Sequence, residues 1–212
     1  MEKFKKNEKN EILKSGAPQI LTPKNFKKNG KKIAFVDCGA KHGIFRDFLR
    51  RGVQIWRFRF DENPLEIGEK FDGIFFSNGP GDPEKIPETI EIARRAIAAK
   101  IPIFGICLGN QILALASGGR TRKMKFGHRG ANQPVQNIFT KKCFVTAQNH
   151  GFEIDEKSLP PDFEIFLKNL NDNSVEGIRH KNLPIFSVQF HPEACAGPRD
   201  AEIFFEEFLQ NL

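Results

Sequence analysis

The sequence contains no tyrosine but 22 phenylalanines, so its aromatic side chains supply packing surface rather than phenol chemistry. It has only four cysteines and no C-x-x-C pair; they are Cys38, Cys107, Cys143 and Cys195. This spacing argues against a zinc site and a disulfide framework, and it favours a reducing compartment. No apolar run approaches the roughly 20 residues of a membrane-spanning helix, and the N-terminus carries charges where a signal peptide needs an apolar core. We therefore expect a soluble, cytoplasmic protein with no membrane contact.

Most of the chain has no net charge. The formal charge of +7 belongs entirely to residues 1–32, which hold ten lysines and three glutamates. This segment also has few apolar side chains, so it cannot bury enough surface to offset the entropy of ordering it. We predict a basic flexible tail or linker at 1–32 and one folded domain at 33–212. Polyanion binding by the tail is the alternative, which tail deletion would test; nucleic acid is not the expected partner.

Apolar stretches that are typical of strands alternate with helical patterns between residues 32 and 117. The expected strands are 32–37, 53–58, 73–77 and 101–106, and the expected helices are 41–51, 87–100 and 108–117. Such alternation indicates parallel βαβ units. We predict an α/β fold with a doubly wound, mostly parallel sheet, helices on both faces, and ligands at the carboxyl ends of the strands.

After residue 117 the pattern changes to short β-prone stretches separated by turn residues. They are 120–126, 135–139, 143–147, 163–167, 175–179 and 185–189, and an amphipathic helix at 201–212 ends the chain. We predict that this part is an antiparallel β extension of the same sheet.

One cysteine stands where the expected strand 101–106 gives way to the helix 108–117. Cys107 lies between Gly105 and Gly109, and a side chain on a sharp strand-to-helix turn stands clear of the sheet. The helix that follows directs its N-terminal amides at any anion formed there. Cys107 is therefore the candidate nucleophile, and a buried, unreactive cysteine is the alternative.

A cysteine nucleophile needs a base, and His191 is the best placed of five histidines because it follows the apolar run 185–190. Pro192 biases His191 towards extended backbone, in which positions i and i+2 face the same way. Glu193 then lies on the side of His191 and can orient its ring. These residues predict a Cys107, His191 and Glu193 triad; a surface turn at 191–193 is the alternative.

The loop 77–83, Ser-Asn-Gly-Pro-Gly-Asp-Pro, follows another expected strand. Its prolines have no amide hydrogen, so Gly79, Gly81 and their polar neighbours are the available donors. One of these amides together with the amide of Leu108 would form a two-donor oxyanion hole. Taken alone, such a loop is more often only a turn.

Several motifs in the same order resemble the class I, triad-type glutamine amidotransferases. They are the elbow 105–109, the loop 77–83 and His-Pro-Glu at 191–193. Three further segments are similar to the amidotransferase domain of the carbamoyl-phosphate synthase small subunit: 124–132, 146–152, and 192–194 with 197–200. The resemblance covers residues 33–212 and implies the flavodoxin-like fold of that family.

This resemblance implies hydrolysis of L-glutamine to glutamate and ammonia through a cysteine thioester. Cys107 would attack the side-chain amide, His191 would transfer the protons, and Glu193 would orient His191. By motif, the oxyanion-hole amides belong to Gly79 and Leu108, and the residues that hold glutamine are Gly81, Gln111, Asn149, Gly151 and Phe152. His150, which lies in the same segment as Phe152, is a candidate for assisting catalysis or substrate positioning and ranks below His191.

The same resemblance implies a partner that consumes the ammonia, the large subunit of carbamoyl-phosphate synthase, in arginine and pyrimidine biosynthesis. No cofactor is implied. We expect no metal cluster either, because the histidines are isolated in the sequence and are better explained as structural or surface residues.

The sequence departs from the family pattern in two ways. Asn110 stands where the family usually has histidine, and we expect this to alter fine structure without loss of triad chemistry. The small subunit normally carries a separate N-terminal domain, whereas residues 1–32 resemble only the interdomain linker. We therefore expect weak, poorly coupled glutaminase activity from this chain in isolation.

Three other functions remain as alternatives. A glutaminase of anthranilate or GMP synthesis shares the triad, but the segments 125–128 and 148–152 are not expected together there. A cysteine hydrolase that acts on another amide is possible because a fold does not determine its substrate. A non-catalytic regulatory subunit is the third alternative, and an unreactive Cys107 would favour it.

Overall fold

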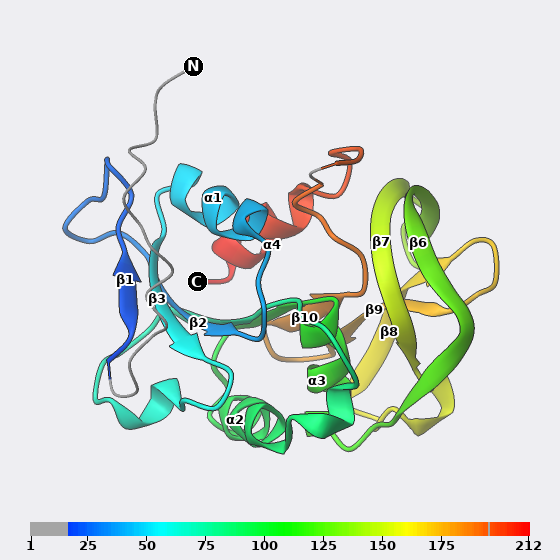
Figure 1. Cartoon of the computed structure of the whole chain (residues 1–212), viewed down its shortest axis with the longest axis horizontal. Helices are drawn as coiled ribbons and strands as arrows, with labels where there is room; N and C mark the ends of the chain where they lie inside the picture. The colour runs from blue at the N-terminus through cyan, green and yellow to red at the C-terminus, as the bar shows by residue number, and fades with distance from the viewer. Residues whose placement is uncertain (1–16, 195) are drawn as a thin grey trace.

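The computed structural model describes residues 17–194 and 196–212, in which ten strands form one sheet with helices on both faces (Figure 1). The strand order is β1-β3-β2-β4-β5-β10-β9-β8-β6-β7. The strands are β1 (Gln19–Leu21), β2 (Lys32–Asp37), β3 (Gln54–Arg59), β4 (Gly73–Phe76), β5 (Ile103–Ile106), β6 (Thr121–Asn137), β7 (Cys143–Ile154), β8 (Phe163–Asn169), β9 (Val175–His180) and β10 (Ile185–Val188). The helices are α1 (His42–Arg50), α2 (Pro87–Ala98), α3 (Leu108–Ala116) and α4 (Ile203–Gln210), with short 3₁₀ turns at Pro64–Glu66, Pro83–Lys85 and Glu156–Ser158.

The predicted parallel sheet is confirmed in strands β3, β2, β4, β5 and β10, each of which pairs in parallel with its neighbour. Strands β4, β5 and β10 are buried at every position. Helices cover both faces of such a sheet, which is why its strands are continuous apolar runs in the sequence. The expected strands and helices of residues 32–117 therefore agree with the structure to within about two residues at each end.

Helices α1 and α4 cover one face of the sheet, and α2 and α3 cover the other (Figure 1). On the first face Phe48 of α1 contacts Phe205 and Phe208 of α4, with ring centroids 5.2 and 6.1 Å apart. On the second face Ile92 of α2 and Ile112 of α3 belong to a separate buried cluster. The two buried clusters thus cover the sheet on both faces.

The antiparallel extension is confirmed for β9, β8, β6 and β7, but three of its expected stretches differ from the structure. Stretches 120–126 and 135–139 are parts of one 17-residue strand, β6, whose pairing with β7 shifts register on both sides of His128. Gly127 (φ 70°) lies within one of these irregularities. This glycine, which in the sequence suggests a turn, therefore marks a β-bulge and not the end of a strand. Stretch 185–189 contains β10, which is parallel to β5 and antiparallel to β9, and thus joins the two halves of the sheet.

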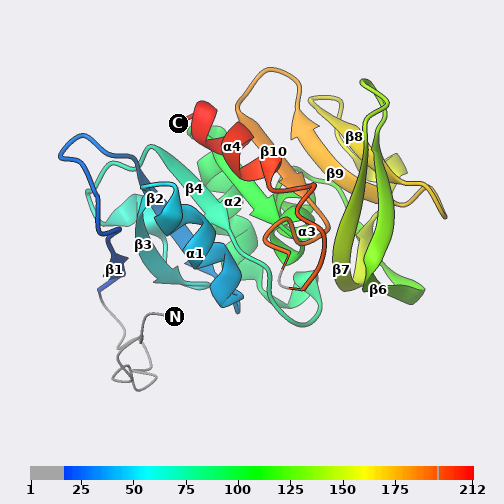
Figure 2. The ribbon, with the colours of Figure 1, turned by 90° about the horizontal axis from the view of Figure 1, so that it is seen from above.

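The tail predicted at 1–32 falls partly outside the described residues, at 1–16. Within 17–32, Gln19–Leu21 forms β1, which pairs with β3, and the backbone amide of Lys32 donates to the Asp72 carboxylate at 2.8 Å. This part of the segment belongs to the folded unit, contrary to the prediction. Figure 2 shows β1 and the β6–β7 ribbon at opposite ends of the sheet. No helix in the described ranges is long and apolar enough to cross a membrane.

Candidate active site

Cys107 occupies the sharp turn between β5 and α3, with φ 56° and ψ −101°. Positive φ is unfavourable for a residue with a side chain, and such strain is typical of functional turns. The turn is held by backbone hydrogen bonds: the Cys107 amide donates to the Val188 carbonyl at 2.8 Å, and the Cys107 carbonyl accepts from the Asn110 amide at 3.1 Å. The sharp strand-to-helix turn predicted at Cys107 is therefore present in the fold.

Two glycines allow the backbone to pack tightly around this elbow. A Cβ on Gly109, in the first turn of α3, would lie 2.2 Å from the Phe76 carbonyl oxygen of β4. A Cβ on Gly79 would lie 2.2 Å from the Cys38 carbonyl oxygen and 2.7 Å from Cδ2 of Leu108. Only glycine permits these approaches, which bring the loop 77–83 against the first residue of α3. Because Leu108 opens α3, its amide has no partner within the helix.

The parallel pairing of β5 with β10 places His191 close to Cys107. Ile106 pairs with Val188, so the residues that follow these two strands emerge at the same edge of the sheet. The chain beyond β10 is held by the His191 amide, which donates to the Ala147 carbonyl of β7 at 2.8 Å. The side chains of His191 and Cys107 line the same cavity and interact with each other there.

His191 and Glu193 are buried, and Nδ1 of His191 lies 2.8 Å from Oε1 of Glu193. A carboxylate accepts from Nδ1–H, which leaves Nε2 as the nitrogen for Cys107. Burial by itself would lower the pKa of His191, but the hydrogen bonds and charges of Cys107 and Glu193 raise this pKa to about 9. The site therefore favours an imidazolium beside the sulfur, which is the partner that a thiolate nucleophile requires.

Lys41 is a site residue that the sequence analysis missed. Its Nζ lies 3.6 Å from Oε1 of Glu193, and its backbone precedes the first residue of α1. Oε2 of Glu193 is buried and has no hydrogen-bond partner among the described residues. The signal that could have found Lys41 is its place in the loop after β2, since that loop also opens at the carboxyl edge of the sheet.

A cavity of about 320 Å³ opens over Cys107 and His191. Six of the seven residues predicted to bind substrate line it: Gly79, Gly81, Gln111, Asn149, Gly151 and Phe152. The seventh, Leu108, has its side chain in the apolar cluster under α3, so its backbone amide is the group that can serve the site. The lining also includes His150, the lower-ranked candidate, and five residues that the sequence did not predict as binding residues, namely Gly39, Lys41, Asn78, Pro80 and Arg129. A small ligand with both charged and amide groups would suit these polar walls.

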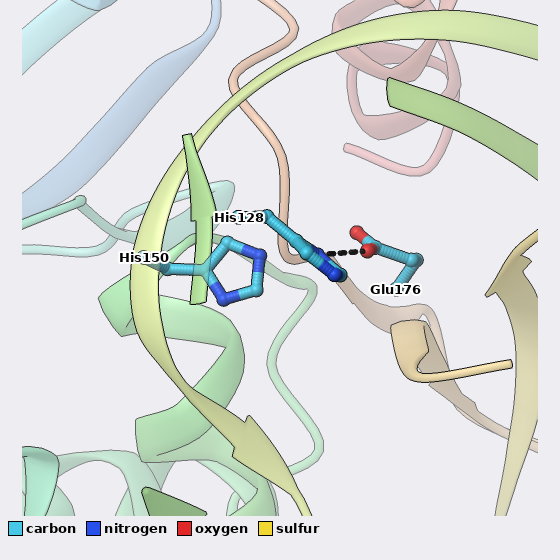
Figure 3. A group of neighbouring side chains, drawn as sticks. All are labelled: His128, His150 and Glu176. Carbon is cyan, nitrogen blue, oxygen red and sulfur yellow. Dashed lines mark ion pairs between the residues drawn. The ribbon is translucent and has the colours of Figure 1, made fainter. Parts of the chain in front are cut away.

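Behind the cavity wall, His128, His150 and Glu176 form a cluster whose potential ligand atoms lie within 4.8 Å of one another (Figure 3). The expectation that the histidines are isolated was wrong, because β6 and β7 pair His128 directly with His150. Figure 3 shows His128 between the other two side chains, so the three do not surround a common point.

The hydrogen bonds of His128 explain why its ring is protonated. Its Nδ1 lies 3.3 Å from Glu176 Oε1 and its Nε2 lies 2.9 Å from Asp172 Oδ2. The hydrogen bond to Glu176 outweighs burial and, with Asp172, raises the pKa of His128 to about 9. Burial lowers the pKa of His150, so His150 is the neutral member of the pair. The cluster is therefore a charged, hydrogen-bonded support for the cavity wall that contains His150.

Comparison with known proteins agrees with this geometry. The family model of class-I glutamine amidotransferases matches residues 34–211. The carbamoyl phosphate synthase small chain of Methanocaldococcus jannaschii is 50% identical over 200 residues, which are 94% of this chain and 55% of that protein. The arginine-specific small chain of Debaryomyces hansenii is 48% identical over 195 residues, or 91% of this chain and 45% of that protein.

The solved structure of a candidate GMP synthase component from Thermoplasma acidophilum has a TM-score of 0.75 and 26% identity, covering 87% of this chain and 95% of that one. The chain spans about half the length of the curated relatives it matches. The match to the family model, the elbow at Cys107 and the histidine and carboxylate beside it all agree: the chain belongs to the class-I glutamine amidotransferases.

Proposed function

We propose that this chain hydrolyses L-glutamine to glutamate and ammonia at Cys107, and that a carbamoyl-phosphate synthase large subunit consumes the ammonia. The observation that carries the proposal is the His191–Glu193 hydrogen bond beside Cys107, at the wall of a small polar cavity. The residues assigned to this reaction are those of the domain 33–212, and its setting is the cytoplasm.

The reaction follows from the charges of the site. The Cys107 thiolate attacks the carboxamide carbon of glutamine, and the C–N bond breaks as the His191 imidazolium gives its proton to the leaving nitrogen. Neutral His191 then takes a proton from water, whose oxygen attacks the thioester carbon. The C–S bond breaks, glutamate leaves, and the thiolate and imidazolium are restored. Glu193 orients the ring and stabilises its charge throughout.

The oxyanion of both tetrahedral intermediates would lie between the amides of Gly79 and Leu108. The close contact of Gly79 with Leu108, which packs the loop 77–83 against the start of α3, supports this assignment. The substrate itself would be held by Gly81, Gln111, Asn149, Gly151 and Phe152, all of which line the cavity.

The large-subunit partner rests on the names of the relatives. Proteins that are 48–50% identical to this chain over 184–200 aligned residues are named carbamoyl phosphate synthase small chains, including an arginine-specific one. Ammonia supply to GMP synthesis is the second candidate, because a solved structure of that description shares the fold at 26% identity. The higher identity to the small chains favours carbamoyl phosphate synthesis.

Glutamine hydrolysis by the wild type and by Cys107→Ala, each with and without a carbamoyl-phosphate synthase large subunit, tests the proposal. We expect weak ammonia release by the wild-type chain alone, faster release with the large subunit, and none from Cys107→Ala. Ammonia release that survives in Cys107→Ala would exclude the thioester. The synthetase component of GMP synthesis serves as the control partner, and stimulation by that protein instead would support the second candidate.

A further inference from the structure

Beneath the elbow, four buried side chains form an unbroken series of hydrogen bonds. Nε2 of Gln111 donates to the Phe152 carbonyl at 2.9 Å and to Oε1 of Gln189 at 3.0 Å. The same Gln189 oxygen accepts from Nδ2 of Asn110 at 3.1 Å, and Oδ1 of Asn110 accepts from the Ser187 hydroxyl at 2.9 Å. None of the four side chains belongs to a residue more than 3% exposed, so water does not compete for these bonds.

The direction of every bond in this series follows from its first member. A backbone carbonyl only accepts, so the Gln111 atom beside the Phe152 oxygen must be the amide nitrogen. The Gln189 atom that faces this nitrogen must then be an oxygen, and the Asn110 atom that faces that oxygen must be a nitrogen. Turning over the Gln189 amide would place donors against donors, and turning over Gln111 or Asn110 would place an acceptor against the Gln189 oxygen.

This arrangement leaves Gln189 with an unmet hydrogen bond. Its Nε2 is buried and has no partner among the described residues. An orphaned buried donor is destabilising, and an apolar side chain at this position would remove it. In this orientation the Gln189 side-chain oxygen accepts two hydrogen bonds, one from Gln111 and one from Asn110.

Gln111 connects this series of hydrogen bonds to the cavity. Both hydrogens of its amide are engaged, one by Phe152 and one by Gln189, and Gln111 lines the cavity beside Cys107. The atom that its side chain can offer to a ligand is therefore Oε1, which only accepts. A charged ammonium group is the strongest donor that a small ligand can present to such an oxygen.

We propose that Gln189 is a positioning residue, which locks the Gln111 carboxamide so that the cavity selects ligands bearing an ammonium group. Asn110 assists by giving the Gln189 oxygen its second donor. The proposal deepens the proposed function, on which it rests for the identity of the ligand as an α-amino acid amide.

The test compares two ligands that differ only in the ammonium group: L-glutamine and 4-carbamoylbutanoate. Their dissociation constants are measured by calorimetry in Cys107→Ala protein, so that no turnover occurs. We expect Cys107→Ala to prefer glutamine, and the added Gln189→Met to reduce that preference about tenfold, because a hydrogen bond to a charged group is lost or weakened. Gln189→Glu keeps an oxygen that accepts both amides, and should retain the preference.

The matched control is Thr89→Val in the same background. Thr89 is also fully buried and donates its hydroxyl to the Phe60 carbonyl, but it lies on α2, which contributes no residue to the cavity. Thr89→Val should keep the preference for glutamine. Should Gln189→Met fail to fold, Asn110→Leu provides the second variant, which should lower the preference in the same direction.

An unchanged preference for glutamine in a folded Gln189→Met or Asn110→Leu protein would overturn the proposal. An equal loss of this preference in Thr89→Val would also overturn it, as would the absence of glutamine binding to the Cys107→Ala protein. Because the readout is binding, it is independent of the reaction. A wild-type chain that discriminated between the ligands through Gln189 but hydrolysed neither would exclude the proposed reaction while leaving the role of Gln189 supported.

Discussion

Glu193 accepts a hydrogen bond from His191, with 2.8 Å between Oε1 and Nδ1, and both residues are closed off from solvent. The pair sets the tautomer of the histidine that faces Cys107. Because Lys41 Nζ lies 3.6 Å from the same carboxylate oxygen, Glu193 lies between two cationic groups, Lys41 and the His191 ring.

Removing the charge of Glu193 should therefore change the titration of His191. In Glu193→Gln an amide oxygen still accepts from Nδ1, but only Cys107 remains to offset the burial that opposes the imidazolium. We expect the pKa of His191 to fall from about 9 by roughly one unit or more. NMR titration of the ring measures this pKa. Glu164→Gln, at a surface pair with Arg179, is the control and should leave it unchanged. An unaltered His191 titration in Glu193→Gln would contradict the role given to this carboxylate.

Gly109→Ala should destabilise the chain even though alanine is the better helix former. The new methyl would lie 2.2 Å from the Phe76 carbonyl oxygen, so β4 and α3 must separate. We expect the free energy of unfolding to fall by roughly 2 kcal/mol, as measured by urea denaturation.

The control for that substitution is Gly52→Ala, where a Cβ would meet nothing within 4 Å but φ is +80°. It should cost only about 1 kcal/mol, from backbone strain alone. A Gly109→Ala protein as stable as the wild type would show that the elbow can relax, and that the close approach is not needed.

Stability should depend on pH through His128. Its pKa in the folded chain, about 9, lies above the ordinary value of about 6.5. The pairing with Glu176 and Asp172 thus contributes fully below about pH 6.5 and is lost as the pH rises through 9. We expect the stability difference between wild type and His128→Gln, measured by urea unfolding, to shrink from pH 6 to pH 10.

Glu176→Gln should flatten the same pH dependence, because it removes the first partner of His128. A stability difference that stayed constant with pH in both variants would mean that His128 is not charged in the fold.

Asn110→His should leave the kinetics of glutamine hydrolysis nearly unchanged. An imidazole N–H can donate to the Gln189 oxygen as the Asn110 amide does now, so Gln111 keeps its orientation. We expect kcat/KM within about threefold of the wild type, which corresponds to less than 1 kcal/mol. Loss of activity by a larger factor, in a protein that unfolds at the wild-type urea concentration, would show that the asparagine itself is required.

Much of the fold could be predicted because the central strands are covered on both faces. β2, β4 and β5 are apolar runs for that reason, and the helices between them keep the 3.6-residue pattern. β6 could not be predicted as one strand, since its glycines occupy bulges that look like turns in the sequence. β1 was missed because three paired residues are too few to stand out in a lysine-rich segment.

The sequence by itself determined the chemistry of the elbow, because a cysteine between two glycines at a strand-to-helix boundary is a local pattern. Tertiary structure alone decided what surrounds it. His191 is 84 positions beyond Cys107 in the chain and reaches it only because β10 lies parallel to β5, in register at Val188 and Ile106. The approach of Lys41 to Glu193, and of Gln189 to Gln111, likewise depends on strands that pair across long separations. Hydrogen bonds of this kind follow from the packing of the sheet, which no short stretch of sequence records.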